Sequence, residues 1–492
     1  MKVSAGTTKD PGLSGFRPDG YYDGVAYKFG PDGSIDAIVS GRVVRFDDFD
    51  AFVRPNLPRR GRKWLTVSLL VFYAIACCVS FFFVQRYYSY LGVTGYDPEL
   101  IPKAIAATLP LAALSLLFAV GRVSFGYALS FYLFTTLLEY SWLATFSTFH
   151  YNKGLAALSI FFSAIAFFIP AIFVTPKIPR PPELSESALS RLLFGIMAVS
   201  GLILVWASTY HFRVIGIQDI YNYRSEIELP GVLRYGVGIT TGALLPFAFT
   251  LFVFRRNWSA AAGAAVLLLL FYPVSLLKLT LLAPAWLIFL TILSLFVEMR
   301  AMVILSLLLP MLAGLATVVF IERGLLDYHQ MNFIFSIANF RMLAVPAFSL
   351  DIYNDFFSRN PLTYFCQISW LKPYVSCPYS EPLAVILAKA YGIGTLNASL
   401  FATEGIASVG LILAPLAALA CGLVVAFGNA LSSHLPPRFV IISSGIVLQS
   451  FLNVPLTTML LTNGAGALFL LWYLTPASIF RASVATGNQM QG

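Results

Sequence analysis

Residues 65–84 read LTVSLLVFYAIACCVSFFFV, an apolar run without a single charged side chain. A helix of this length is about 30 Å long, which matches the hydrocarbon thickness of a bilayer. Basic residues come just before the run, at Arg54, Arg59, Arg60, Arg62 and Lys63. Because lysine and arginine beside a span stay in the cytoplasm, this cluster predicts a cytoplasmic N-terminus.

The rest of the chain has the same apolar character. Of its 492 residues, 58% are hydrophobic and 11% are charged, whereas about 25% are charged in a soluble domain. In hydrocarbon every backbone N–H and C=O needs a partner within the protein, so long apolar runs must be helices. We therefore expect an all-α polytopic membrane protein. Runs bounded by charge, proline or glycine predict about twelve spans, at 65–84, 103–121, 125–148, 155–175, 191–210, 237–254, 259–276, 279–298, 301–320, 406–427, 439–455 and 465–480.

Charge in the connections supports this topology. The predicted inner connections and the residue after the last span carry cations, at Arg122, Lys177, Arg180, Arg191, Arg255, Arg256, Arg300, Arg438 and Arg481. An even number of spans leaves both termini in the cytoplasm. The net charge of +9 is spread over these membrane flanks, so it does not indicate binding of nucleic acid.

Three parts follow from this reading. Residues 1–63 form a polar cytoplasmic tail, in which YKFGPDGSIDAIVSGRVVRF (27–46) predicts a β-hairpin around Pro-Asp-Gly-Ser. Residues 64–482 form the transmembrane domain, and 483–492 a cytoplasmic C-terminal tail. Within the membrane domain, 211–236 and 321–405 are unusually long outer loops. Long structured loops are usually functional.

The second outer loop is too apolar for an ordinary soluble loop. Its stretches MNFIFSIANF (331–340) and EPLAVILAKAYGIGTLNASLF (381–401) predict interfacial or re-entrant helices. Cys366 and Cys377 lie in the same loop, on the oxidising side of the membrane. They form a disulfide or remain free thiols, and the sequence leaves both readings open.

Cations on the outer face run against the usual charge bias. They are Arg213, Arg224, Arg234, Lys278, Arg323, Arg341 and Arg359. A planar guanidinium suits bidentate binding of phosphate or diphosphate, and a lysine adds a point charge. In the alternative reading, these side chains reach lipid phosphates or pair with Asp219, Glu226 and Glu228.

Carboxylates and aromatic rings gather in the second loop. Asp351, Asp355 and Glu404 accompany Tyr353, Phe356, Phe357 and Tyr364. Sugar rings stack on aromatic faces, and their hydroxyls bond to carboxylates and amides. The alternative is interfacial aromatic packing with helix caps. Glu404 stands at the mouth of a long apolar span, where it is either a functional carboxylate or a cap of that helix.

Motifs of soluble enzymes do not occur. The chain has no phosphate loop of the GxxxxGK[ST] type, no CxxC, no HExxH and no GxSxG. An ATP-driven or zinc-dependent reaction is therefore not expected.

Four local patterns resemble the oligosaccharide repeat-unit (O-antigen, Wzy-type) polymerases of bacterial envelopes. They are IYNYRSEIELPG with LRYG (220–231 and 233–236), Lys278 at the start of a span, Arg341–Pro346 followed by DIYNDFFSRNPLTYF (351–365), and LNASLFATEGIASVGLILAPLAAL (396–419). The resemblance covers roughly residues 191–431.

This resemblance implies a GT-C-like glycosyltransferase of the bacterial inner membrane, without cofactor, nucleotide or metal. Its substrates would be undecaprenyl-diphosphate-linked oligosaccharides, joined into surface polysaccharide such as the O-antigen of lipopolysaccharide. A flippase and a chain-length regulator are the implied protein partners. A hydroxyl of the acceptor unit would attack the anomeric carbon of the donor, and undecaprenyl diphosphate would leave.

The implied roles fall on three groups of residues. The diphosphate would bind Arg224, Arg234, Lys278 and Arg341, of which Arg341 would also act in catalysis by stabilising the leaving group. Glu404 or Asp355 would activate or orient the acceptor hydroxyl. Tyr353, Tyr364 and Asn397 would line the glycan groove. Two other functions stay open: a flippase or transporter of lipid-linked sugars, and an O-antigen-ligase-type transferase that passes finished polymer to another acceptor.

Overall fold

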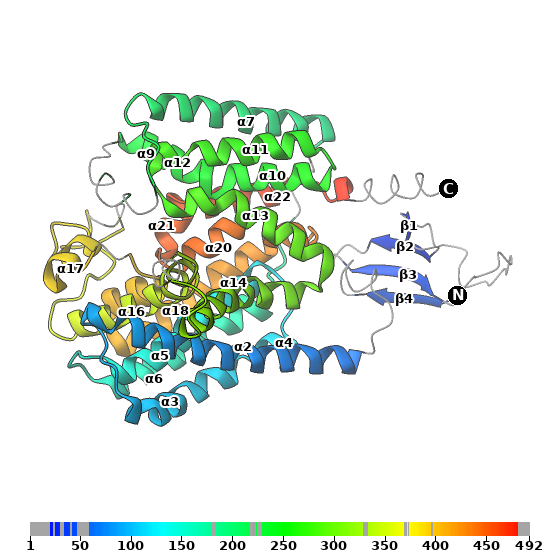
Figure 1. The fold of residues 1–492 in the computed structure, drawn as a ribbon. Coiled ribbons are helices and arrows are strands. Elements are labelled where there is room, and N and C mark those ends of the chain that lie inside the picture. The colour runs from blue at the N-terminus through cyan, green and yellow to red at the C-terminus, as the bar shows by residue number, and fades with distance from the viewer. Residues whose placement is uncertain are drawn as a thin grey trace.

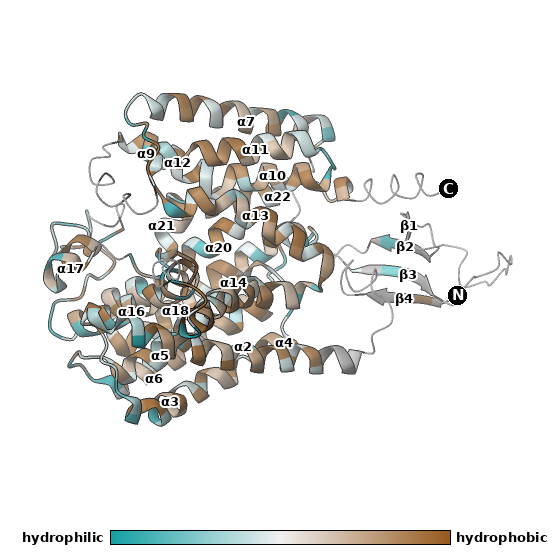
Figure 2. Cartoon of the chain, in the orientation of Figure 1, coloured by the Kyte–Doolittle hydropathy of each residue, from teal (hydrophilic) through white to brown (hydrophobic). Residues whose placement is uncertain are grey.

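The computed structural model describes residues 20–22, 25–29, 34–39, 42–46, 59–179, 184–216, 220, 223, 229–327, 333–368, 371, 373–394 and 397–480. Most of them are helical, and the fold is the expected all-α polytopic bundle (Figure 1). Hydrophobic residues cover its helices along their length (Figure 2).

The first half of the bundle consists of α2 (Arg59–Tyr88), α3 (Ile101–Leu114), α4 (Leu117–Val120), α5 (Phe125–Phe146), α6 (Lys153–Phe173), α7 (Glu186–Ser208), α9 (Gly231–Ile239), the π-helix η4 (Thr240–Leu244) and α10 (Leu245–Phe254). The second half consists of α11 (Trp258–Leu270), α12 (Tyr272–Ser275), α13 (Lys278–Phe296), α14 (Met299–Glu322), the π-helix η5 (Ser336–Ala344), α16 (Val345–Phe357), α17 (Leu383–Tyr391), the π-helix η6 (Phe401–Ala407), α18 (Ser408–Ser432), α19 (Pro437–Ser443), α20 (Gly445–Phe451), α21 (Leu456–Leu461) and α22 (Ala465–Leu474).

Ten helices in the described part of the chain are long and apolar enough to cross a membrane. Nine of them match predicted spans, and the tenth, Phe333–Phe357, lies inside the predicted loop 321–405. The predicted spans 439–455 and 465–480 are instead broken into the short helices α19, α20, α21 and α22. Pro455 separates α20 from α21, since proline lacks the N–H that continues a helix. Gly464, with a φ of 87°, separates α21 from α22.

Helix α5 runs through the centre of the bundle. Nearly all of its side chains are buried, including the carboxyl of Glu139, and it contacts α2, α3, α6, α16 and α18. A helix surrounded by protein can carry more polar residues than one that faces lipid. This explains why the predicted span 125–148 forms a continuous helix although its composition is less apolar than that of its neighbours.

The bundle has two distinct ends, which we call the α17 end and the termini end. At the α17 end the Phe149 ring packs edge-on against Tyr391 of α17, and a β-bridge between Thr94 and Ser147 ties the chain after α2 to the end of α5. The N-terminal strands and the last described residues, up to 480, lie on the opposite side (Figure 1). The predicted topology assigns the α17 end to the outer face of the membrane.

The helix 333–357, formed by η5 and α16, has partners at the α17 end near both of its own ends. The Phe335 ring stacks on Tyr88 at the end of α2, and Asp351 accepts a hydrogen bond from Tyr151, just before α6. Between these points Asn339 donates to Ser80 Oγ over 2.8 Å and to the Met311 carbonyl oxygen over 3.1 Å, deeper in the bundle. The prediction of an interfacial or re-entrant helix at 331–340 stays a prediction, because the helix 333–357 is also long and apolar enough to cross a membrane.

A re-entrant element precedes α18. Gly410 has a φ of 75° and a ψ of 172°, so the chain reverses there. As a result η6 folds back on α18, and Gly405 lies against Ala414. The Thr363 N–H donates to the Ala407 carbonyl oxygen over 2.8 Å, which fixes the turn beside the chain that follows α16.

The N-terminal strands form an antiparallel sheet in the order β1 (Gly20–Tyr22), β2 (Val25–Phe29), β3 (Ile35–Val39) and β4 (Arg42–Phe46). The predicted hairpin is the β2–β3 pair, in which Tyr27 lies opposite Ala37. The sheet therefore extends the single predicted hairpin on both sides. It stands outside the helical bundle (Figure 1).

Candidate functional site at the α17 end

Interrupted helices distinguish the α17 half of the bundle. Among the described residues there are three π-helical segments, and two of them carry predicted functional residues: η5 contains Arg341 and η6 contains Glu404. Insertions of this kind are frequent at functional sites because they turn side chains and backbone groups away from the regular helix. Irregular backbone within a membrane is tolerated where it is buried in protein or lines a polar cavity.

Glu404 is bound to a different helix from the one it was predicted to cap. Its Oε1 accepts hydrogen bonds from the backbone N–H and from the hydroxyl of Thr457, each over 3.0 Å. Thr457 lies in the first turn of α21, so the carboxyl caps α21. The side chain is 3% exposed, and its Oε2 is buried without a hydrogen-bond partner among the described residues. That oxygen is enclosed by protein.

Tyr353 lies beside this carboxyl. Its hydroxyl is within hydrogen-bonding reach of Thr403 and interacts electrostatically with Glu404. Because Tyr353 is itself buried, it has little surface on which a sugar could stack. Its position favours support of η6 over the predicted place in a glycan groove.

The structure brings two of the predicted cations together. Lys278 begins α13 directly after a break at Leu276, which has a φ of 47°. Arg341 is exposed on η5 and interacts electrostatically with Lys278 across 63 positions of sequence. Beside it, Met342 Sδ accepts a 3.5 Å hydrogen bond from Gln449 of α20, which holds η5 next to α20. Two cations that interact in this way favour an anion close to both.

The other predicted diphosphate ligands do not join this pair in the described contacts. Arg234 is exposed on α9 and donates to the Leu229 carbonyl oxygen over 3.3 Å, at the start of its own helix. Arg224 lies outside the described residues, as do Asp219, Glu226 and Glu228. Only Lys278 and Arg341 therefore support the predicted anion site.

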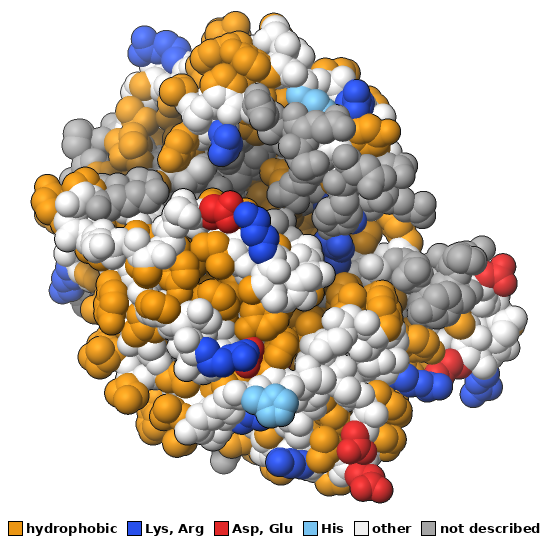
Figure 3. Space-filling model, turned by 90° about the vertical axis from the view of Figure 1, so that its left-hand side faces the viewer, with side chains coloured by type: hydrophobic (Ala, Val, Ile, Leu, Met, Phe, Trp, Pro, Cys, Tyr) orange, Lys and Arg blue, Asp and Glu red, His pale blue; other side chains and the backbone are white. Residues whose placement is uncertain are grey.

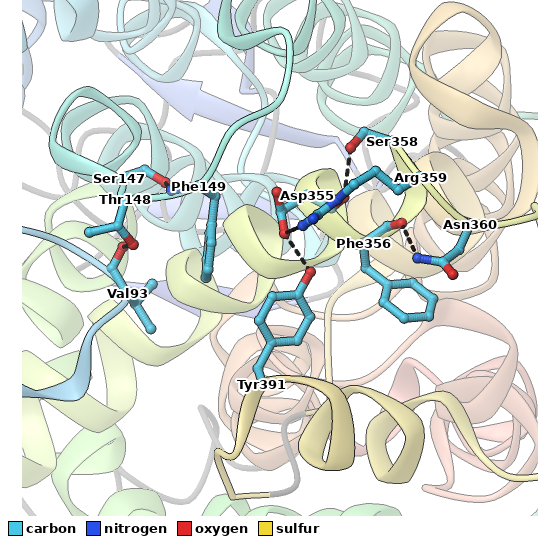
Figure 4. Close-up of polar contacts among 10 residues, drawn as sticks. All are labelled: Val93, Ser147, Thr148, Phe149, Asp355, Phe356, Ser358, Arg359, Asn360 and Tyr391. Atoms are coloured by element: carbon cyan, nitrogen blue, oxygen red, sulfur yellow. Dashed lines mark hydrogen bonds and ion pairs between the residues drawn. The ribbon is translucent and has the colours of Figure 1, made fainter.

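Asp355 belongs to a second polar group at the α17 end (Figure 4). It forms a salt bridge with Arg359 and accepts a 2.6 Å hydrogen bond from the Tyr391 hydroxyl. Burial, and secondly the Asp355 carboxylate, raise the pKa of Tyr391, so this hydroxyl is a proton donor at neutral pH. Arg359, predicted as an anion ligand, lies just after α16 and is thus engaged by a carboxylate of that helix. These contacts connect Asp355 to α17 and leave Glu404 in a different group.

A chain of hydrogen bonds continues from the second group into the bundle. Tyr151 donates to Asp351, the Tyr140 and Tyr151 hydroxyls are 3.0 Å apart, and Asn354 Nδ2 donates to Tyr140 over 3.1 Å. Burial raises the pKa of Tyr151, which keeps its proton on the phenol. The network positions α16 against α5, and this role explains why α16 carries buried acids.

Tyr364 and Asn397 both precede η6 in the sequence, after α16 and after α17 respectively. Tyr364 is 60% exposed, has a φ of 47° and donates its N–H to the Ser408 carbonyl oxygen over 3.2 Å. Asn397 is exposed, and its carbonyl oxygen accepts a 3.4 Å hydrogen bond from Ser349. Both are accessible, as a groove would need. Cys366 and Cys377 form a disulfide that closes the loop after Tyr364.

The surface of the α17 end is mixed rather than uniformly cationic. Figure 3 shows separate lysine and arginine side chains around hydrophobic ones on this face. Sequence reasoning missed Thr457 and Gln449, because both sit in or beside a predicted span that was taken as regular. The signal was Pro455, which lies between α20 and α21 and precedes the first residue of α21.

No protein-family model, no curated protein and no solved structure matches this chain.

Proposed function

We propose that this membrane protein transfers glycan between lipid-diphosphate-linked oligosaccharides, as a polymerase of repeat units at the outer face of the bacterial inner membrane. The observation that carries the proposal is the pairing of Lys278 with Arg341 at the α17 end. A reaction that releases a lipid diphosphate needs stabilisation of developing negative charge, and fixed cations provide it.

In the proposed reaction Glu404 acts on the acceptor unit, and the pair of cations, Lys278 and Arg341, acts on the donor. The acceptor hydroxyl oxygen forms a bond to the anomeric carbon of the donor, and the bond from that carbon to the diphosphate oxygen breaks. The leaving diphosphate keeps the bonding electrons, and Lys278 and Arg341 bind its charge. Glu404 Oε2 takes the hydroxyl proton while Thr457 holds Oε1. Helix α16 packs on η6 and continues from η5, so one rigid element connects the two halves of the site.

The test is transfer in a defined membrane. Purified full-length protein in nanodiscs is incubated with a synthetic lipid-diphosphate repeat unit, without nucleotide. The proposal expects a ladder of longer glycans on a gel, and it expects Arg341→Ala to abolish the ladder. A well-folded preparation that gives no transfer to any acceptor would refute it. Transfer only to a different acceptor, with no ladder, would favour the ligase alternative.

A transporter of lipid-linked sugars is the second candidate, favoured by the interrupted helices. Breaks at Leu276, Gly410 and Gly464 resemble the discontinuous helices on which transporters build their substrate sites. In that case labelled lipid-linked sugar would cross sealed vesicles that contain the protein, and no glycan bond would form. The buried carboxyl with one unengaged oxygen favours chemistry over transport.

A further inference from the structure

An apolar groove runs along the membrane-facing side of α18 and α22. Its walls include Val424, Phe427 and Leu431 of α18 and Phe469 and Leu470 of α22, and its volume is about 540 Å³. Gly428 lies under the Phe469 ring, so this ring forms the floor, and Gly466 lets the backbone of Leu460 approach α22 closely. No side chain of the described residues fills the groove.

The groove extends from the termini end toward Glu404. At one extremity the Tyr473 hydroxyl donates to the Pro179 carbonyl oxygen over 2.9 Å, in the connection between α6 and α7. At the other, the lining includes Leu460 of α21. Thr457, which binds Glu404, lies in the turn of α21 before Leu460. A chain in the groove therefore leads up to the candidate site.

Position and lining define the occupant. The groove lies along the second half of a membrane-spanning helix, where the surroundings are hydrocarbon. With lining side chains that are apolar except for the Tyr473 hydroxyl, it has no group that would bind a sugar or a diphosphate. A long flexible hydrocarbon chain is the ligand that buries the most apolar area there. Leu460 lies about one turn of α21 after Thr457, which binds Glu404, and this proximity favours the chain of a substrate over that of a bulk phospholipid.

We infer that this groove binds the isoprenoid chain of a lipid-diphosphate substrate, so that the polar head reaches Glu404 and the cation pair. This inference rests on the proposed function, which it deepens by placing the lipid tail. It predicts that the enzyme recognises chain length and not only the sugar and the diphosphate.

Photolabelling tests the position of the tail without depending on turnover. The full chain in phospholipid nanodiscs is irradiated with a lipid diphosphate that carries a photoreactive group in its isoprenoid chain. We expect adducts on peptides around Val424–Leu431 and Phe469–Tyr473, suppressed by unlabelled lipid diphosphate but not by added phospholipid. Adducts spread equally over lipid-facing α7, or suppressed equally by phospholipid, would overturn the inference.

A matched pair of variants tests the consequence for turnover. Val424→Trp fills the groove, whereas Leu423→Trp adds the same ring at the adjacent position, which is 51% exposed and outside the lining. We expect Val424→Trp to raise KM for a long-chain substrate about tenfold and to leave KM for a short-chain analogue unchanged, while Leu423→Trp changes neither. Leu470→Trp, with Leu461→Trp as its control, repeats the comparison on the other wall if Val424→Trp does not fold.

The two hypotheses fail in different ways. If the unchanged protein elongates glycan but Val424→Trp and Leu470→Trp keep the KM for the long-chain substrate, the tail does not lie in the groove and the proposed function stands. If the unchanged protein forms no glycan bond while the groove is labelled specifically, the proposed polymerase function fails and the groove remains a lipid site.

Discussion

Glu404 and Thr457 are 53 positions apart in the chain and are joined by two hydrogen bonds of 3.0 Å, both to the same carboxyl oxygen. The π-helix η6 and the helix α21 therefore meet at a single side chain. The second carboxyl oxygen has no hydrogen-bond partner among the described residues. This asymmetry is what the proposed chemistry needs, because one oxygen positions the group and the other reacts.

Removing the hydroxyl of Thr457 should loosen this carboxyl. Thr457→Val keeps the shape and the backbone N–H but loses one bond to Glu404. A lost hydrogen bond to a charged group costs about 1.5–3 kcal/mol, so kcat for glycan transfer should fall by about tenfold or more. Thr457→Ser restores the hydroxyl and should restore most of the rate. Equal rates for the valine and serine variants would argue against a positioning role.

The carboxyl of Glu404 should be essential, whereas another buried carboxyl should not. Glu404→Gln keeps the volume but cannot accept the proton, and we expect the ladder to disappear. Glu139→Gln is the matched control, because Glu139 is also buried in the bundle but lies on α5, with both oxygens lacking a partner among the described residues. A single-turnover assay measures both. Loss of activity in both variants, with similar losses of melting temperature, would point to a structural effect.

The cation pair predicts a graded response to substitution. Arg341→Ala and Lys278→Ala should each lower kcat/KM by about a hundredfold or more, since each leaves diphosphate charge uncompensated. Arg341→Lys should retain more activity than Arg341→Ala. Arg323 is a suitable control, because it is an exposed arginine at the end of α14 outside the pair. If Arg323→Ala reduced transfer as much as Arg341→Ala, the effect would belong to the general charge of this face.

The disulfide should determine how firmly the loop after Tyr364 is held. Closing a loop of this length stabilises it by about 3 kcal/mol in the chain-entropy description. Reduction, or Cys366→Ser with Cys377→Ser, should therefore increase cleavage by protease within 361–382. Cys421→Ser, a change at a free buried cysteine, should leave cleavage unchanged. Protection that is the same before and after reduction would show that other contacts hold the loop.

The contact between Tyr391 and Asp355 should hold α17 against α16. The pKa of Tyr391 is raised, so its hydroxyl stays protonated at every pH below the ordinary pKa of tyrosine. The hydrogen bond to Asp355 is therefore fully formed there and is lost only as pH rises through the raised pKa. The protection of α17 amides from hydrogen exchange, after correction for the pH dependence of the intrinsic exchange rate, should therefore be the same at pH 7 and pH 9. Tyr391→Phe should increase the corrected exchange rate of these amides at both pH values. A Tyr374→Phe control removes an exposed hydroxyl from the same loop and should have no effect.

Composition and charge predicted the class of fold and nine of the spans, because the length of an apolar run is set directly by membrane thickness. They did not predict how α16 and η6 lie. Phe333–Phe357 is as long and apolar as the other spans, and contacts with Tyr88 and Tyr151 connect it near both of its ends to the α17 end. A hydropathy profile does not include such contacts between residues that are distant in the sequence.

The site was predictable in part for the same reason. Outer arginines stood out against the usual charge bias, and Arg341 and Lys278 did come together. Asp355 and Arg359 carried the same sequence signal but neutralise each other at i and i+4. Thr457 carried no signal, because it contacts Glu404 only through the fold of the last two helices.

The position of η5 inside the bundle has a consequence for biosynthesis. Asn339 binds Ser80, 259 positions earlier, so η5 cannot find its place until α2 and α14 already stand in the membrane. The partner of Glu404 lies later still, in α21. The chain must therefore be synthesised through Thr457 before the two halves of the site can assemble. Truncation anywhere before Thr457 should leave an inserted protein without a completed site, which would be exposed to membrane quality-control proteases.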